Sequence, residues 1–125
     1  MLNIYQQNII DYYKNPRYHY ALDDYDEMVS EVNTICGDAV TIYIKKQANG
    51  KLSFSFLGEG CAISQAATSM LLEDLNDTDD IEEIRDKINL DYVKSLLGIP
   101  LDNPARLKCA NLCIVSLRKS KILGI

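Results

Sequence analysis

The chain has 125 residues, of which 47% are hydrophobic and 25% are charged, and this is the composition of an ordinary folded protein. Its length predicts one domain over residues 1–125. The 18 acidic side chains outnumber the 13 basic ones, so the formal net charge is −5 at pH 7. That balance argues against a nucleic-acid binder and against attachment to an anionic membrane, since both need a basic surface. No apolar run approaches the length that crosses a bilayer.

The chemistry of the four cysteines depends on the cellular compartment. The first residues show neither a basic segment nor a small-residue cleavage site, so we expect no export and a cytoplasmic location. In a reducing compartment, cysteines are thiols, metal ligands or redox groups rather than a disulfide framework. This expectation covers Cys36, Cys61, Cys109 and Cys113.

Apolar spacing predicts one helix and then three strands in the first half of the chain. Apolar residues three and four positions apart, beginning with Leu2, predict a helix over 2–14 that ends before Pro16. A loop is expected over 17–26, and apolar residues from Met28 to Ile35 suggest a short strand. The β-branched and aromatic run 39–47 predicts a second strand.

A hairpin is the clearest structural prediction. Residues 52–57 alternate between apolar and polar up to Phe56, which predicts a strand that pairs with 39–47. Asn49-Gly50 lies between them and suits a type I′ turn, which needs positive φ at both central residues.

The second half of the chain is expected to be helical. Helices are predicted over 61–75, over 91–97 with an end at Gly98, and over 109–119. A further helix is expected after Asp77 or Thr78, either of which can cap it. Its inner face would carry Ile81, Ile84 and Ile88. The order of elements predicts an α+β two-layer domain, in which an antiparallel sheet of about three strands packs against several helices.

Three cysteines are expected at the ends of secondary-structure elements. Cys36 lies between two predicted strands, Cys61 lies where a strand gives way to a helix, and Cys109 opens the last predicted helix. A helix N-terminus lowers the pKa of a thiol, and the thiolate is both a nucleophile and a metal ligand. With Asp38, three thiolates and one carboxylate form a ligand set that zinc accepts. The chain has no C-x-x-C pair, so it is equally possible that the cysteines are not metal ligands and pack in the core as small hydrophobic residues. This alternative fits Cys113 best.

Three short motifs surround these cysteines. They read Cys36-Gly37-Asp38, Gly58-x-Gly60-Cys61-Ala62-Ile63-Ser64 and Cys109-Ala110-x-Leu112. The pattern Tyr5-(x)3-Ile9-Ile10-Asp11-(x)4-Pro16-Arg17 precedes them. In this order the motifs resemble those of the U-type iron–sulfur cluster assembly proteins, the IscU/NifU/SufU family, over nearly the whole chain.

Two features decide which branch of the family the chain resembles. Lys108 stands where IscU-type scaffolds have a histidine, and 101–107 does not reproduce their Leu-Pro-Pro-Val-Lys chaperone segment. The pattern Pro104-x-Arg106-x-Lys108-Cys109 is instead similar to the SufU branch. The short spacing from Cys61 to Cys109 departs from that branch, because SufU proteins carry an insertion there.

The resemblance to SufU implies that the protein is a zinc-binding sulfur acceptor with zinc-dependent sulfurtransferase activity. It would take persulfide sulfur on Cys36 from a pyridoxal-phosphate cysteine desulfurase. The implied zinc ligands are Cys36, Asp38, Cys61 and Cys109. Arg106 would pair with Asp38 or with a carboxylate of the partner enzyme, unless it is simply a solvated surface residue.

The resemblance to IscU implies a different role. The same pocket would assemble a transient [2Fe–2S] cluster, with Cys109 as the sulfur acceptor and with apo-proteins or downstream assembly proteins as recipients. A structural zinc domain without sulfur chemistry is a third interpretation. A thiol–disulfide oxidoreductase is disfavoured because the chain has no C-x-x-C motif.

Other notable residues are expected to be structural. His19, the only histidine, lies in the loop after the first helix and matches no ligand position. Tyrosines gather in the same region, where packing on the sheet is favoured over a partner-binding surface. They are Tyr12, Tyr13, Tyr18, Tyr20 and Tyr25.

Overall fold

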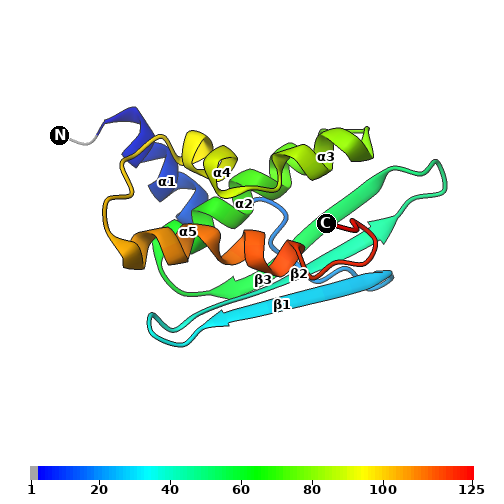
Figure 1. Ribbon diagram of the computed structural model, residues 1–125, viewed down its shortest axis with the longest axis horizontal. Coiled ribbons are helices and arrows are strands. Elements are labelled where there is room, and N and C mark those ends of the chain that lie inside the picture. The colour runs from blue at the N-terminus through cyan, green and yellow to red at the C-terminus, as the bar shows by residue number, and fades with distance from the viewer. Residues whose placement is uncertain (1–2) are drawn as a thin grey trace.

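The computed structural model describes residues 3–125 and confirms the expected α+β architecture. A three-stranded sheet forms one layer and five helices form the other (Figure 1). The elements are α1 (Ile4–Lys14), β1 (Glu27–Asn33), β2 (Asp38–Lys46), β3 (Leu52–Glu59), α2 (Ala62–Asn76), α3 (Ile81–Lys87), α4 (Leu90–Leu97) and α5 (Pro104–Leu117). No helix within the described residues is both long and apolar enough to span a membrane.

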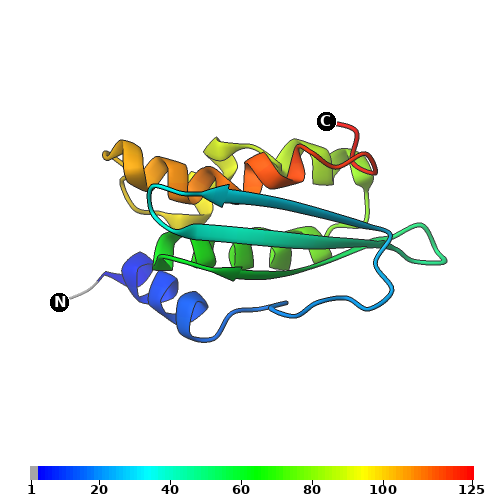
Figure 2. The ribbon, with the colours of Figure 1, turned by 90° about the horizontal axis from the view of Figure 1, so that it is seen from below.

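The sheet is antiparallel in the order β1-β2-β3, and its helices cover one face only (Figure 2). Alternate residues of β2 point toward the helices, and Ile42 and Ile44 are fully buried there. Phe54 and Phe56 of β3 lie on the same face. Burying each such side chain stabilises the fold by about 1.5–3 kcal/mol, so this face holds the sheet and helices together.

The β2–β3 hairpin forms as expected, but the predicted type I′ turn is wrong. Gly50 has φ 86°, whereas Asn49 is not among the described residues with positive φ. The Gly50 N–H donates to the Gln47 carbonyl at 2.9 Å, and the Gln47 N–H donates to the Lys51 carbonyl at 2.7 Å. This is a three-residue loop in which a left-handed glycine follows the turn, and only one residue needs positive φ.

The first helix starts slightly later than predicted, and the third has a different cap. Asn3 caps α1 and exchanges two hydrogen bonds with Gln6, while Leu2 lies outside the described residues. Asp80 caps α3, in place of the expected Asp77 or Thr78. The Thr78 hydroxyl instead donates to a carbonyl of the last turn of α2, so this threonine ends one helix and does not start the next.

The last helix begins five residues earlier than predicted, at Pro104. Asn103 caps it by accepting a hydrogen bond from the Ala105 N–H at 2.7 Å. Proline is well suited to the first helical position, because its missing N–H would have no partner there. Cys109 therefore lies in the second turn of α5 and not at a helix N-terminus.

Candidate metal centre

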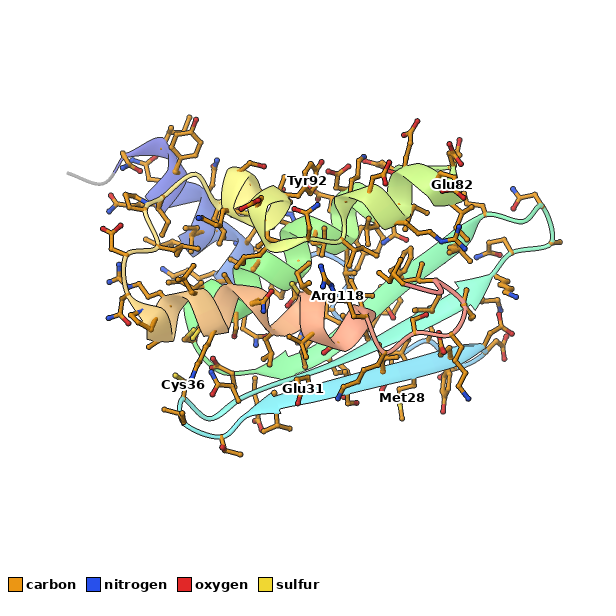
Figure 3. The ribbon with its side chains drawn as sticks, in the orientation of Figure 1. Met28, Glu31, Cys36, Glu82, Tyr92 and Arg118 are labelled. Carbon is orange, nitrogen blue, oxygen red and sulfur yellow. The ribbon has the colours of Figure 1, made fainter. Side chains whose placement is uncertain are left out.

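Three of the four predicted ligands meet at one end of the sheet, where the β1–β2 loop approaches α5. Cys36 lies in that loop, Asp38 begins β2 and Cys109 comes from α5. One ligand atom from each of these three residues lies within 4.8 Å of the other two. Figure 3 shows Cys36 at this end of the molecule. The turn between β1 and β2 and the helix α5, which are far apart in the sequence, thus place two sulfurs and a carboxylate together.

Cys61 borders this group through Asp38. It is the N-cap of α2, and its sulfur accepts a hydrogen bond from the Ser64 N–H at 3.4 Å. Its own N–H donates to Asp38 Oδ1 at 2.8 Å, and its Sγ lies 3.8 Å from Asp38 Oδ2. Of the three cysteines expected at element ends, Cys61 is the one that the structure places at a helix N-terminus.

Asp38 is the centre of the group and is completely buried. A buried carboxylate is costly unless it is hydrogen-bonded or paired with a cation, and the Cys61 N–H supplies one of the required bonds. Gly60 makes room for it, because a Cβ at this position would lie 2.1 Å from Asp38 Oδ1. Gly60 also has φ 136°, a conformation that side chains disfavour. The glycine before Cys61 is therefore needed for the carboxylate's position.

Cys109 is buried, and its electrostatic setting differs from the sequence prediction. Burial, followed by the hydrogen bonds and charges of Asp38 and Cys61, raises the pKa of the Cys109 thiol far above its ordinary value. The predicted lowering at a helix N-terminus is wrong for this residue, because α5 begins at Pro104. A buried thiol beside a carboxylate needs a cation to ionise. The crowding of acidic groups and the sulfur-rich donor set of Cys36, Asp38 and Cys109 suit a metal ion.

Arg106 does not pair with Asp38. It is exposed, and no ion pair links these two residues in the part of the chain that the structure describes. Arg106 instead borders a shallow apolar groove between α1 and the starts of α2 and α5. The groove is lined by Gln6, Ile9, Ile10, Ile63, Ile99 and Arg106. The pairing with Asp38 is therefore wrong, whereas contact with a partner carboxylate and a solvated surface position both stay predictions.

Cys113 and His19 lie outside the group of ligand atoms. Cys113 is buried in α5, its thiol donates to the Ala110 carbonyl at 3.6 Å, and burial raises its pKa to about 12. The His19 ring packs on Phe56 with ring centroids 4.9 Å apart. Both placements agree with the structural roles expected from the sequence.

The tyrosines near the first helix divide into packed and exposed members. Tyr12 is partly buried, donates to Glu73 at 2.5 Å and lies against the Arg17 guanidinium. Tyr13, Tyr20 and Tyr25 are exposed. The expected packing role therefore fits Tyr12, whereas the rings of Tyr13, Tyr20 and Tyr25 are not part of the core.

Asn33 is a residue near the site that the sequence reasoning missed. It is the last residue of β1 and pairs with Asp38 across the sheet. Its amide nitrogen is buried without a hydrogen-bond partner. The signal available in the sequence was its place three residues before Cys36, within the predicted strand.

Comparison with known proteins identifies the family. The profile of the NifU-like N-terminal domain matches residues 4–120. The zinc-dependent sulfurtransferase SufU of Bacillus subtilis is 34% identical, and the alignment covers 93% of this chain and 88% of that protein. The iron–sulfur cluster assembly scaffold protein IscU 1 of Archaeoglobus fulgidus is also 34% identical, with 94% of this chain and 74% of that protein covered.

A solved structure shares the fold. The crystal structure of FiSufU from Fervidobacterium islandicum AW-1 matches with a TM-score of 0.73 and 24% identity, over 91% of this chain and 93% of that one. The profile match and the relatives together show that the chain belongs to the family of the NifU-like N-terminal domain.

Proposed function

We propose that this protein works in iron–sulfur cluster assembly as a zinc-binding acceptor of persulfide sulfur. The observation that carries the proposal is the convergence of Cys36, Asp38 and Cys109 within 4.8 Å, with Cys61 beside Asp38. The relative named zinc-dependent sulfurtransferase supports the zinc and sulfur-transfer parts of it. The donor of sulfur would be a pyridoxal-phosphate cysteine desulfurase.

Cys36 is suited to accept the sulfur because it is exposed. It lies in the β1–β2 loop beside Gly37, which has φ 70°, and a Cβ built on that glycine would meet nothing within 4 Å, so the loop is not packed against other residues at this point. Its thiolate attacks the outer sulfur of the desulfurase persulfide and forms a new S–S bond. The S–S bond on the desulfurase breaks, and its electron pair leaves on the desulfurase cysteine as a thiolate.

The other ligand residues hold the site together while Cys36 reacts. Bound zinc supplies the positive charge that keeps cysteine sulfurs deprotonated at neutral pH. Cys109 is buried and out of reach of a large partner, so it stays a ligand in this mechanism. Asp38 offers a hard oxygen among soft sulfurs and is the ligand expected to exchange most readily.

Arg106 is proposed to contact the partner enzyme. It is exposed at the start of α5, three residues before Cys109, and no described side chain pairs with it. An unpaired guanidinium three residues from Cys109 in the sequence is suited to bind a carboxylate of the desulfurase.

A scaffold that builds a transient [2Fe–2S] cluster and transfers it to apo-proteins is the second candidate. The scaffold relative from Archaeoglobus fulgidus, which is 34% identical, favours it. The spacing between Cys61 and Cys109, which lacks the insertion of SufU proteins, also favours it. In this role Cys109 would receive the sulfur, and the cluster would be the protein's cargo.

Sulfur uptake by cysteine variants separates the two candidates. The zinc-loaded protein is incubated with a desulfurase and cysteine, and mass spectrometry then locates the added sulfur. We expect sulfur on Cys36, loss of uptake in Cys36→Ser, and normal uptake in Cys113→Ser, the matched buried control. Uptake that persists in Cys36→Ser and is lost in Cys109→Ser, with iron and sulfide bound after reconstitution, would instead establish the scaffold.

A further inference from the structure

A buried amide without a partner lies at the same end of the sheet as the metal centre. Nδ2 of Asn33 is shielded from solvent and, among residues 3–125, meets no hydrogen-bond acceptor. Two buried hydroxyls share this state, those of Ser55 in the middle of β3 and Ser116 in the last turn of α5. A buried amide rarely stays unpaired in folded proteins, so its presence beside a binding site indicates a missing acceptor.

The register of the sheet places Asn33 beside the carboxylate. Asn33 and Asp38 are directly opposite each other in β1 and β2. Such pairs project from the same face with their Cβ atoms about 4.5–5.5 Å apart. Glu31, two residues earlier on that face, forms an ion pair with Lys119 beyond the end of α5 at 3.0 Å. Figure 3 shows Glu31 and, further toward the β1–β2 loop, Cys36.

Cys36 is the sulfur that the loop brings back toward Asn33. Residues 34–37 form a turn between the paired Asn33 and Asp38, so the chain reverses over the pair. The Cys36 sulfur reaches within 4.8 Å of an Asp38 oxygen, which puts it on the side of the sheet where the Asn33 amide lies. A thiolate accepts hydrogen bonds, and a neutral N–H donor stabilises its charge without competing for the metal.

We propose that the Asn33 amide donates a hydrogen bond to the Cys36 sulfur when zinc is bound, and that Asn33 thereby positions this sulfur. The inference rests on the proposed zinc site. It makes Asn33 a positioning residue, which acts through Cys36 and touches neither the zinc nor the incoming sulfur. Hydrogen bonds to metal ligands commonly change metal affinity by about 10–100-fold, so the effect is large enough to measure.

The test compares the wild type with Asn33→Leu, which has a similar volume and no donor. Zinc affinity is measured by competition with a chromophoric chelator, and cobalt(II) replaces zinc to report the thiolate-to-metal charge-transfer band. Thermal unfolding of the zinc-free protein is followed in parallel. Ser116→Ala is the matched control, because it removes another unpaired buried polar group far along α5 from the ligands.

We expect Asn33→Leu to bind zinc about 10–100-fold more weakly and to shift the cobalt band, while the zinc-free protein unfolds at the same or a higher temperature. Ser116→Ala should bind both metals as the wild type does. Wild-type affinity and an unchanged band in Asn33→Leu would overturn the inference, and so would a zinc-free form that unfolds earlier, which indicates a merely structural role.

Cys36→Ser in the same titration separates this inference from the proposed zinc site. If Cys36→Ser weakens zinc binding and Asn33→Leu does not, the role of Asn33 alone is wrong. If neither variant changes the affinity or the cobalt band, the zinc site with Cys36 as ligand is itself wrong, and the inference falls with it.

Discussion

At the scale of the residue, Gly60 is the position where one added methyl group should do most harm to the site. A Cβ there would lie 2.1 Å from Asp38 Oδ1, and φ 136° is unfavourable for alanine. We expect Gly60→Ala to displace the carboxylate, to lower the free energy of unfolding by about 2–3 kcal/mol and to weaken zinc binding. Urea unfolding and zinc content after dialysis measure the two effects.

Gly50→Ala is the control for backbone strain alone. Gly50 also has positive φ, at 86°, but a Cβ there would meet nothing within 4 Å. We expect a loss of about 1–2 kcal/mol in stability with zinc binding intact. Equal zinc loss in both variants would mean that general destabilisation, and not the position of Asp38, governs the site.

At the scale of the element, Glu27 fastens the segment after α5 to the start of β1. Its carboxylate accepts hydrogen bonds from the Ser120 hydroxyl and from the N–H groups of Lys121 and Ile122. Partial burial acts to raise the pKa of Glu27, but these hydrogen bonds outweigh it and the pKa lies below its ordinary value. A depressed carboxyl pKa stabilises the folded state above the unfolded pKa, and this stabilisation is lost as the pH falls through the folded pKa.

We therefore expect Glu27→Gln to unfold about 1–3 kcal/mol more easily at pH 7, with a difference that shrinks below about pH 4.5. Guanidinium unfolding at pH 7 and near pH 3 measures this. Glu82→Gln is the control, because Glu82 forms an exposed pair with Arg85 at 2.8 Å and should change stability by less than about 1 kcal/mol. A pH-independent Glu27 effect would contradict the hydrogen-bonded carboxylate.

The elements also show which sequence signals were sufficient. Strands and most helices could be predicted because their apolar periodicity is local, and Gly98 marked the end of α4 with its left-handed φ of 67°. The start of α5 was predicted too late, at Cys109, although asparagine at the cap and proline at the first helical position are known helix-starting signals and Asn103-Pro104 supplies both. The predicted type I′ turn at Asn49-Gly50 was wrong because an Asn-Gly pair is compatible with more than one loop length.

At the scale of the whole molecule, the site depends on tertiary packing that no local pattern reports. The motifs identified Cys36, Asp38, Cys61 and Cys109 as candidates, but their convergence requires α5 to pack on the sheet with Cys109 facing Asp38. Burial there reversed the direction predicted for the Cys109 pKa, because burial is a property of the fold. The position of the unpaired Asn33 amide opposite Asp38 likewise depends on the pairing of β1 with β2, which the sequence alone does not give.

Because the proposed zinc site joins the β1–β2 loop, α2 and α5, zinc binding should stabilise the entire fold. A ligand that binds only the native state stabilises it by about 2.7 kcal/mol at one hundred times its Kd. For a chain of this size, we expect zinc to raise Tm by on the order of 10 °C, and a chelator to reverse the gain. Differential scanning calorimetry of Cys109→Ser, which lacks a ligand, should show little or no gain.

The same linkage gives zinc binding a pH dependence. Burial and the neighbouring Asp38 and Cys61 raise the pKa of Cys109, so its thiol is protonated at neutral pH in the zinc-free protein. Zinc binding must release that proton, and affinity should therefore fall as the pH falls from about 8 to 6. The zinc-induced gain in Tm should shrink over the same range, whereas the Tm of the zinc-free protein should change less. A gain in Tm that is constant with pH would show that Cys109 does not lose a proton to bind zinc.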